Sequence, residues 1–369
     1  MSSFFDYSHA IGTRQDPHAQ EREARSQPLL LHSMSVFREI FAIIFDHREI
    51  STVVEVGVES GAVSGVYAEL GASSVYCVDP QPTEELRANL AGNDALHVVE
   101  KSSPEVFTDL PLADLYVLDG DHNYAVVSQE LHWILAHAPD AVVVLHDVLW
   151  PCSRRDLYYE PSPLSSKDKH PASSDGPTVW HDDLTPAGFV GLHAFTSSVH
   201  AGGERNGVLT AVEDALSQAH DDEWHFELIP AVFGMGVVVR QTSPSASRLI
   251  DSLRPYSGSR LLAAMENNRI ALYTRLLQFQ YEAARHAGDA DKLADSISAQ
   301  RREIEALEAD LETSKARHAA EVQGLQRETQ RLEQLPAERA TQPRIGAMVK
   351  DLGHIAASQL RKARPRQRG

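Results

Sequence analysis

The feature that most constrains the fold is a succession of short apolar runs rich in β-branched residues, each followed by a helical segment. Five such runs are predicted to be strands: Thr52 to Val56, Ser74 to Val78, Leu96 to Val99, Leu115 to Leu118 and Ala141 to Leu145. Continuous apolar strands that alternate with helices are typical of a parallel sheet covered on both faces. Because crossovers between parallel strands are right-handed, few other topologies remain. We therefore predict a doubly wound α/β fold.

Two further apolar runs complete the predicted sheet. They cover Glu223 to Leu228 and Gly236 to Arg240 and are separated by a turn that contains glycine. This spacing favours an antiparallel pair of strands, which would close one edge of the sheet. The prediction is a mostly parallel, seven-stranded, Rossmann-like domain over residues 28–245, with a helix from Leu29 to His47 packed against it.

Composition narrows the class of protein. The 369 residues carry 34 basic and 52 acidic side chains, for a net charge of −18, and include only two cysteines, Cys77 and Cys152. Two distant cysteines favour a reducing compartment. No run of about 18 apolar residues, the length that predicts a membrane span, occurs in the chain. We expect a cytoplasmic protein whose negative charge disfavours nucleic acid as a partner.

Other segments differ from the domain in composition. Residues 1–27 are polar and aperiodic and are predicted to be a mobile arm, whereas residues 246–290 are predicted to be helical. Residues 147–206 lie inside the domain but lose all periodicity and are rich in Pro, Ser, His and Asp. Because so long a loop in a compact domain is more often functional than a simple connection, we interpret it as a substrate lid.

A seven-residue repeat runs through residues 291–336. It consists of Ile297, Ile304, Leu311, His318, Leu325 and Leu332 and stops before Pro336. A coiled coil needs a second apolar column, and here that column is poorer. Two interpretations stay open: a coiled coil that makes the protein a homo-oligomer, and a solvated single helix.

The last segment, residues 337–369, is a basic and weakly amphipathic tail. Residues 340–369 hold seven basic side chains and one acidic one. Such a tail suits peripheral contact with the anionic inner face of a membrane or with an acidic partner, and it equally suits a disordered solubilising segment.

A nucleotide site is predicted where the first strand ends. The run from Val53 to Gly61 is a strand that enters a turn with glycines at positions 57 and 61, where the backbone must turn tightly or approach a ligand. Asp79 follows the second strand and is placed to accept hydrogen bonds from a ribose. Since Glu55 and Glu59 would repel a pyrophosphate, a cationic adenosine cofactor such as S-adenosylmethionine fits better.

From about Val53 to Arg240 the chain resembles class I S-adenosylmethionine-dependent methyltransferases. It resembles in particular the metal-dependent branch that methylates sugars on macrolides and aminocoumarins and includes cephalosporin-hydroxylase-like proteins. The resemblance implies that Glu55 and Gly57 border the methionine part of the cofactor and that Asp79 holds the ribose. It also implies that Ser102 or Ser103 lies by the adenine.

Polar residues at two neighbouring strand ends predict a metal site. Asp119 follows the fourth strand, and His146 and Asp147 follow the fifth. Because the carboxyl ends of parallel strands meet at the ligand-binding edge of such a sheet, these three side chains should converge. Two carboxylates and an imidazole suit Mg²⁺ or Mn²⁺ with positions left open for a substrate. The resembling sugar methyltransferases bind a divalent ion with residues at the matching positions.

Methyl transfer to an alcohol requires a base, because a neutral hydroxyl is a poor nucleophile. His122, three residues after Asp119, is the first candidate, and Asp121 is the second. Substrate contacts are predicted from the lid, whose side chains suit polyols through stacking and bidentate hydrogen bonds. The residues predicted for this role are Arg154, Arg155, Tyr158, His181 and Asp182.

The sequence therefore predicts a metal-dependent O-methyltransferase that acts on a hydroxyl of a sugar, glycan or polyhydroxylated metabolite. Two alternatives remain. The same cofactor and metal sites could serve hydroxylation chemistry, or the chain could be a non-catalytic scaffold assembled by its coiled coil.

Overall fold

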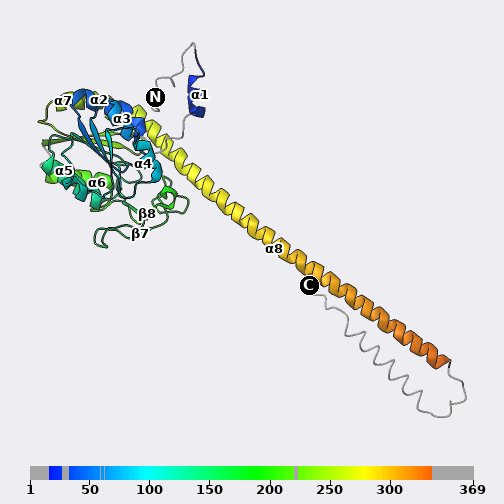
Figure 1. Ribbon diagram of the computed structural model, residues 1–369. Helices are drawn as coiled ribbons and strands as arrows, with labels where there is room; N and C mark the ends of the chain where they lie inside the picture. Colours follow the sequence, from blue (N-terminus) through cyan, green and yellow to red (C-terminus); the bar gives the residue numbers. More distant parts are fainter. Residues whose placement is uncertain (1–15, 27–32, 59, 62, 220–222, 335–369) are drawn as a thin grey trace. The chain divides into compact units, whose positions relative to one another are not determined.

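A seven-stranded sheet organises the chain between residues 52 and 240 (Figure 1). The computed structural model describes residues 16–26, 33–58, 60–61, 63–219 and 223–334. The strands are β1 (Thr52–Val56), β2 (Ser74–Val78), β3 (Leu96–Val99), β4 (Leu115–Leu118), β5 (Val142–Leu145), β9 (Trp224–Ile229) and β10 (Met235–Arg240). Their order is β3-β2-β1-β4-β5-β10-β9, with β10 antiparallel to both of its neighbours. The predicted mostly parallel sheet is confirmed.

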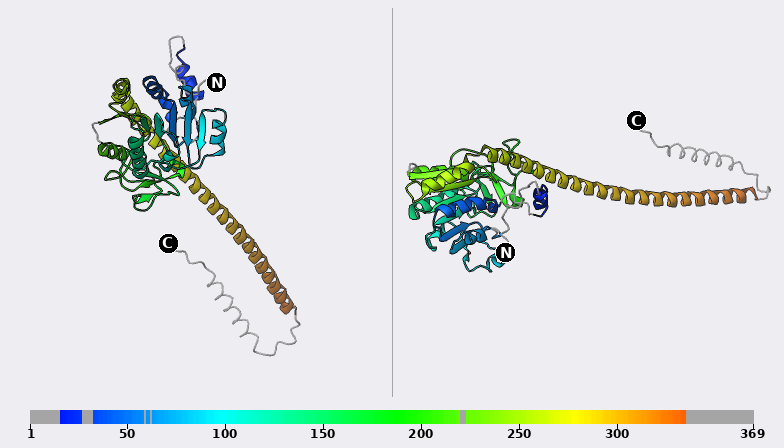
Figure 2. Two further views of the ribbon diagram at one scale, coloured as in Figure 1. Left: turned by 60° about the vertical axis from the view of Figure 1, so that its left-hand side comes forward. Right: turned by 90° about the horizontal axis from the view of Figure 1, so that it is seen from above.

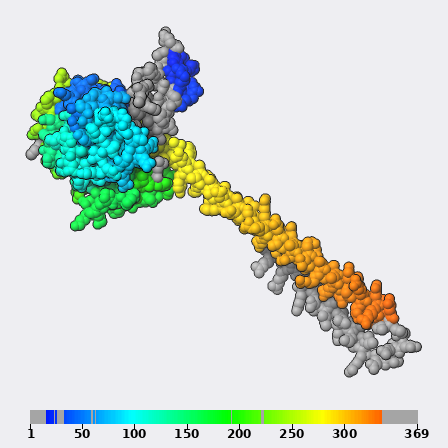
Figure 3. Space-filling view, viewed as in Figure 1, coloured from blue at the N-terminus to red at the C-terminus, as the bar shows by residue number. Residues whose placement is uncertain are grey.

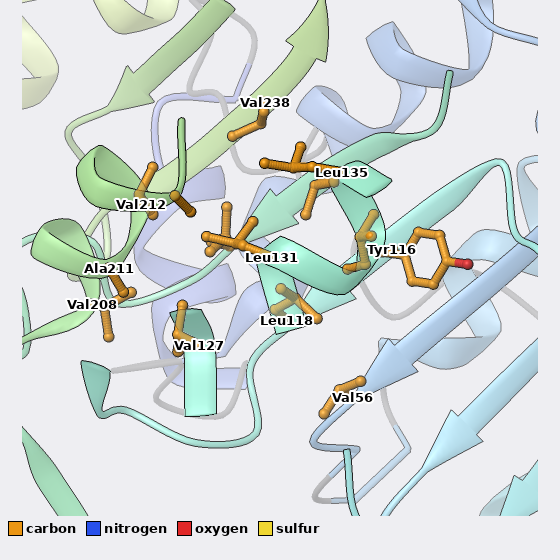
Figure 4. Close-up of a cluster of buried hydrophobic side chains, with 14 of the residues drawn as sticks. Val56, Tyr116, Leu118, Val127, Leu131, Leu135, Val208, Ala211, Val212 and Val238 are labelled. Carbon is orange, nitrogen blue, oxygen red and sulfur yellow. The ribbon is translucent and has the colours of Figure 1, made fainter. Parts of the chain in front are cut away.

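Helices cover both faces of this sheet (Figure 2). One face carries α2 (Arg38–His47), α3 (Ser64–Glu69), α4 (Glu84–Leu90) and α7 (Ala246–Ser257), and the other carries α5 (Tyr124–His137) and α6 (Val208–Gln218). Successive strand residues point to opposite faces. Val53 accordingly packs under the first group of helices, and Val54 and Val56 pack on the side of α5 and α6. Figure 4 shows side chains of α5, α6 and the sheet meeting in this second core.

The lid contains a small sheet that the sequence did not predict. Its strands are β6 (Leu157–Tyr159), β7 (Ala172–Ser173) and β8 (Phe195–Ser198), in the order β6-β8-β7. Strands of two to four residues are too short to show an alternating pattern, which is why the segment reads as aperiodic. Three short 3₁₀ helices are also described: η2 (Met34–Phe37), η3 (Glu105–Thr108) and η4 (Gly191–His193).

Part of the predicted N-terminal arm is helical. The described residues include α1 (Ala19–Ser26), where Arg25 lies 3.3 Å from the Glu21 carboxylate one turn away. Charged pairs at this spacing support short helices in polar sequences. Residues 1–15 lie outside the described part, as does the beginning of the helix predicted from Leu29.

The chain divides into two units, residues 1–286 and 287–369, so the first unit runs past the boundary predicted near residue 245. Helix α7 belongs to it, because Leu249, Ile250 and Leu253 are buried in the core beside α2. The first turns of α8 (Arg260–Glu333) also belong to it. They bury Glu266 and Thr274, while the apolar side chains of Leu261, Met265 and Leu272 in this segment are at least 61% exposed.

The second unit consists, where described, of the remainder of α8. This helix is continuous over 74 residues, and every described residue from 287 onward is exposed (Figure 3). The repeat over residues 291–336 is therefore helical up to Glu333, while its pairing into a coiled coil stays a prediction. The basic tail over residues 337–369 lies outside the described residues. Among the described helices, none combines the length and apolar character that crossing a membrane requires.

Candidate active site

The turn that follows β1, residues 57–61, is shaped by close packing; we call it the first turn. Gly57 has a φ of +83°, and a Cβ added there would lie 2.4 Å from the backbone oxygen of Asp119. Gly61 has a φ of +75°, and its Cβ would lie 2.9 Å from Leu90 Cδ2. Only glycine tolerates both constraints. The first turn thus brings the end of β1 directly against the end of β4. Glu59 falls outside the described residues.

Glu55 is a buried acid that holds α3, the helix that follows the first turn. It is 3% exposed, and its carboxyl accepts hydrogen bonds from the hydroxyls of Ser64 and, at 3.3 Å, of Tyr67. Burial raises the pKa of Glu55 to about 8; the Ser64 hydroxyl opposes this shift and the nearby charge of Asp119 adds to it. At neutral pH the group is mostly uncharged, so in this structure Glu55 does not carry the negative charge predicted beside the turn.

The other predicted cofactor residues lie at the same edge of the sheet. Asp79 follows β2, and its Oδ1 accepts a 2.8 Å hydrogen bond from the backbone N of Gln81. Ser102 is exposed, whereas the Ser103 hydroxyl donates to the buried carboxyl of Glu130 on α5. Of the two serines, Ser102 is the one with an accessible side chain. All these residues follow strands, where folds of this type bind nucleotides.

Asp119, His146 and Asp147 converge as the sequence predicted. Their ligand atoms all lie within 4.8 Å of one another. His146 Nδ1 is 2.9 Å from Asp119 Oδ1 and 3.8 Å from Asp147 Oδ1. Within the described part of the chain, Asp147 Oδ1 is buried and has no hydrogen-bond partner. A buried carboxylate oxygen without a partner is costly, so it fits a ligand position for a cation.

The orientation of His146 also fits a metal ligand. Its Nε2 lies 2.7 Å from the carbonyl oxygen of Val232 and donates to it, which leaves Nδ1 directed at the carboxylates. Burial lowers the pKa of His146, but the charges of Asp119 and Asp147 outweigh burial and raise it to about 9. Two carboxylates that face one ring nitrogen thus favour positive charge at this point. We call these three residues the donor set.

Asp147 connects the donor set to the predicted base. Its backbone has a φ of 58°, and its Oδ2 lies 3.0 Å from His122 Nδ1. His122 is buried, and Asp121 beside it accepts a hydrogen bond from Asn123. Burial raises the pKa of Asp121, although the charge of His122 opposes the shift. Helix α5 is capped by the Asn123 side chain, so Asp121 is not needed as its cap.

Cys152 completes a second cluster with His122 and Asp147. Burial raises the pKa of the Cys152 thiol well above its usual value, and neighbouring carboxylates add to the shift. Only the thiolate is a good metal ligand or nucleophile. Cys152 therefore packs against the site as a neutral thiol.

The lid places aromatic rings over His122. Neighbouring residues on β6 point to opposite sides. The Tyr158 side chain is buried, and its hydroxyl donates to Asp156 Oδ2 at 2.8 Å. The Tyr159 ring lies 6.1 Å from the His122 ring, and the Phe195 ring lies 5.6 Å from it. Tyr159, rather than the predicted Tyr158, is thus the tyrosine that faces the site.

The other predicted substrate residues are divided between structure and surface. Arg155 is buried, and its guanidinium donates to backbone oxygens of Ser198, Val199 and Asp182, which ties the lid together. Arg154 forms a two-pronged ion pair with Glu213 of α6 at 2.6 and 2.7 Å. His181 and Asp182 are exposed. Their contact with a substrate stays a prediction.

Two further residues near the donor set were not predicted, Val232 and Glu266. Val232 contacts His146 from the turn between β9 and β10, and no pattern in the sequence places this turn beside β5. Glu266 contacts that turn from α8, and the local pattern does not single it out. The signal for Tyr159 was available, because a tyrosine pair on a short strand must direct one ring to each side.

Comparisons with known proteins concern the part of the chain that contains this site. A family model described as a methyltransferase domain matches residues 54–148, which contain the first turn, Asp79 and the whole donor set. No curated protein matches the chain in sequence.

Several solved structures are similar to part of this chain. One is a provisionally assigned caffeoyl-CoA O-methyltransferase from Staphylococcus aureus, at 11% identity and a TM-score of 0.37, which covers 63% of this chain and 95% of that one. Another is the SAH-bound methyltransferase PaMTH1 of Podospora anserina, at 14% identity and a TM-score of 0.36, over 60% and 85% of the two chains. Because identities and TM-scores are low, these proteins indicate nothing about the substrate. Residues 54–148, a minority of the 369-residue chain, are thus similar to a methyltransferase domain.

Proposed function

We propose that this protein is a metal-dependent O-methyltransferase that transfers a methyl group from S-adenosylmethionine to a hydroxyl of a sugar, a glycan or another polyhydroxylated metabolite. The observation that carries the proposal is the position of Asp147. Asp147 Oδ1 is buried at the donor set and has no hydrogen-bond partner among the described residues. Asp147 Oδ2 lies 3.0 Å from His122 Nδ1. The same carboxylate would therefore hold the cation and orient the base.

The residues that would hold S-adenosylmethionine and the divalent cation lie at the carboxyl edge of the sheet. Asp79, the first turn and Ser102 would hold S-adenosylmethionine, which supplies an electrophilic methyl group on a sulfonium. The donor set would hold Mg²⁺ or Mn²⁺, whose charge makes a nearby hydroxyl more acidic. Oxygen and imidazole donors of this kind are compatible with either ion.

His122 is the proposed base. When its Nδ1–H donates to Asp147 Oδ2, its Nε2 carries a lone pair and can accept a proton. S-adenosylmethionine would supply the methyl group, leaving with the carbon–sulfur electron pair on sulfur, and His122 would take the proton from the acceptor hydroxyl as its oxygen bonds to the methyl carbon. General bases of this type contribute about 10²-fold to 10⁴-fold to a rate. Asp121 is the alternative base, because burial raises its pKa.

The lid supports a polyol as the acceptor. Tyr159 and Phe195 lie 4.6 Å apart, ring centroid to ring centroid, and present apolar surface beside His122. A sugar can stack its C–H face on such rings while its hydroxyls reach a cation and a base. Tyr159 is 44% exposed, so its ring is accessible from solvent.

The test begins with calorimetry of the full-length protein with S-adenosylmethionine in the presence of Mn²⁺. Failure to bind would remove the proposal. Cell extracts incubated with the protein and methyl-labelled cofactor should yield a product heavier by a CH₂ unit, whereas a product heavier by one oxygen atom would indicate hydroxylation. Asp147→Asn should lower the rate by at least about 10²-fold, because it disturbs both the cation and the base. Asp109→Asn, at an exposed position paired with Lys101, is the matched control.

We also propose that α8 pairs with a second copy of the chain. Two columns of residues run along one side of the helix, and within each column successive members are seven residues apart. The first consists of Leu276, Ala283, Ala290, Ile297, Ile304, Leu311, His318, Leu325 and Leu332, and the second of Leu272, Phe279, His286, Leu293, Gln300, Leu307, Ser314, Glu321 and Glu328. The large apolar members are exposed in the single chain, and identical stripes on two copies can cover each other.

Light scattering tests this pairing. Ile304→Asn, within the stripe, should shift the protein from the mass of a dimer to that of a monomer. Ala309→Asn lies on the opposite side of the helix and should leave the mass unchanged. A monomeric wild-type protein would contradict the pairing without touching the proposed chemistry.

A further inference from the structure

The first turns of α8 hold the turn between β9 and β10, residues 230–234, which we call the second turn. Glu266 of α8 is 6% exposed, and its carboxylate accepts hydrogen bonds from the backbone N of Val232 at 2.9 Å and of Phe233 at 2.8 Å. Arg269 donates to the same carboxylate at 2.7 and 2.8 Å, and its guanidinium lies 4.4 Å from the centre of the Phe233 ring. Both oxygens of Glu266 thus have partners.

The second turn needs such a support because its backbone is strained. Val232, Phe233 and Gly234 have φ values of 44°, 64° and 90°. A β-branched residue rarely adopts this region, and the conformation persists only where the surroundings impose it. Two successive N–H groups in such a turn form a concave site for an anion. Here the anion is the carboxylate of Glu266.

The same turn contacts the donor set on its other side. The carbonyl oxygen of Val232 accepts the hydrogen bond from His146 Nε2. The carbonyl oxygens of Phe233 and Gly234 accept from the backbone N of Leu149 at 2.7 Å and of Val148 at 3.3 Å. These two amides belong to the segment that directly follows Asp147. A displacement of the second turn would therefore move the His146 ring and the backbone that directs Asp147.

We propose that Glu266 is a positioning residue for the donor set. It holds the second turn in its left-handed conformation and thereby fixes the carbonyl that orients His146 and the amides that anchor the chain after Asp147. Through this contact the C-terminal helix sets the affinity of the site for a divalent cation. The inference rests on the proposed function, because it assumes that the donor set binds a cation.

The experiment compares Glu266→Gln with wild type in the full-length protein. Free Mn²⁺ is measured by electron paramagnetic resonance during a titration. Loss of a group that supports a metal ligand weakens binding by about 10-fold to 100-fold, and we expect a value near the lower figure because Glu266 acts through the backbone. Affinity for S-adenosylmethionine should change by less than about twofold, since the first turn is not involved. Backbone amides of Val232 and Phe233 should exchange with deuterium faster.

Two further variants complete the test. Glu282→Gln, on the same helix and hydrogen-bonded only within it in the described structure, is the matched control and should bind Mn²⁺ as wild type does. In Val232→Gly combined with Glu266→Gln, glycine adopts the turn without strain, so most of the lost Mn²⁺ affinity should return. If Glu266→Gln does not fold, Glu266→Asp provides the same comparison, because its shorter side chain keeps the charge but not the reach.

The outcomes separate this inference from the metal proposal. If wild type bound no Mn²⁺, the metal proposal would fall and the inference with it. If wild type bound Mn²⁺ and Glu266→Gln bound it equally well while melting at a lower temperature, Glu266 would have a purely structural role and the inference would be overturned. Weaker Mn²⁺ binding that the glycine substitution restores would support it.

Discussion

The first and second turns border the same donor set, and a buried glutamate lies beside each, yet the two glutamates differ in charge. Glu55, beside the first turn, meets the hydroxyls of Ser64 and Tyr67, and burial raises its pKa to about 8. Glu266, under the second turn, meets two backbone N–H groups and Arg269. Burial would raise the pKa of Glu266, but these partners outweigh burial and lower it.

The comparison teaches that the partners of a buried acid, more than its burial, determine its charge and its use. Hydroxyls hydrogen-bond to either form of a carboxyl group, whereas N–H groups and a guanidinium select the ionised form. The first turn thus lies beside a neutral group near the site proposed for a cationic cofactor. The second turn rests on a fixed negative charge that holds a strained backbone. The following predictions test each half of this contrast.

Gly57→Ala should have the largest effect. The added methyl group would lie 2.4 Å from the backbone oxygen of Asp119, and the φ of +83° is unfavourable for alanine. Because the obstacle is the backbone of a central strand, it cannot move aside. We expect a loss of about 4 kcal/mol in the free energy of unfolding, measured by urea denaturation.

Gly65→Ala is the control for this substitution. Gly65 lies in α3, and nothing lies within 4 Å of the position that its Cβ would occupy. Alanine should raise the stability there by about 0.5 to 1 kcal/mol, because it is the better helix former. Equal losses at positions 57 and 65 would show that the first turn is not limited by its approach to β4.

Gly234→Ala should have an intermediate effect, which compares the second turn with the first. Its φ is +90°, and the nearest atom to an added Cβ is Leu149 Cγ at 2.6 Å, in a side chain that can rotate, while the Leu149 backbone N lies farther away at 2.9 Å. We expect a loss of about 2 kcal/mol by the same measurement. A loss as large as that of Gly57→Ala would mean that the second turn is the more rigid of the two.

The parts of the fold and of the site that could be predicted from the sequence are those set by regular strands. The five parallel strands, the first turn and the donor set all follow from apolar runs and from residues placed directly after them, because parallel strands end at a common edge. Asp119, His146 and Asp147 are read from such positions. Because a regular strand fixes where the residues after it lie, spacing in the sequence predicts which of these residues approach one another.

The parts that escaped prediction depend on contacts between distant segments. Nothing near Glu266 in the sequence indicates that it meets Val232, 34 positions earlier. The charge state of Glu55 likewise depends on Tyr67 and on depth in the core, which spacing does not reveal. Lid strands of a few residues carry too little pattern to be recognised.

Glu55→Gln tests a different quantity, the dependence of stability on pH. The pKa of Glu55 is 4.5 in its ordinary state and about 8 in the folded protein. Below pH 4.5 both states are protonated. Between these values the unfolded chain releases the proton and the folded protein keeps it, so stability falls as pH rises, by up to about 1.4 kcal/mol per pH unit, and levels off above about 8. Glutamine stays neutral, so this fall should be reduced in the variant.

Two matched substitutions determine how the result is interpreted. Glu130 is also buried with a pKa of about 8, so Glu130→Gln should likewise reduce the loss of stability with rising pH. Glu55→Gln alone should therefore leave part of that loss. Glu266→Gln should lower stability by the same amount at every pH from 5 to 8, because the lowered pKa keeps Glu266 ionised throughout that interval. The contribution of Glu266 is lost only under more acidic conditions. An unchanged slope in Glu55→Gln, or a slope in Glu266→Gln that differs from that of wild type, would show that the two glutamates have the same charge after all.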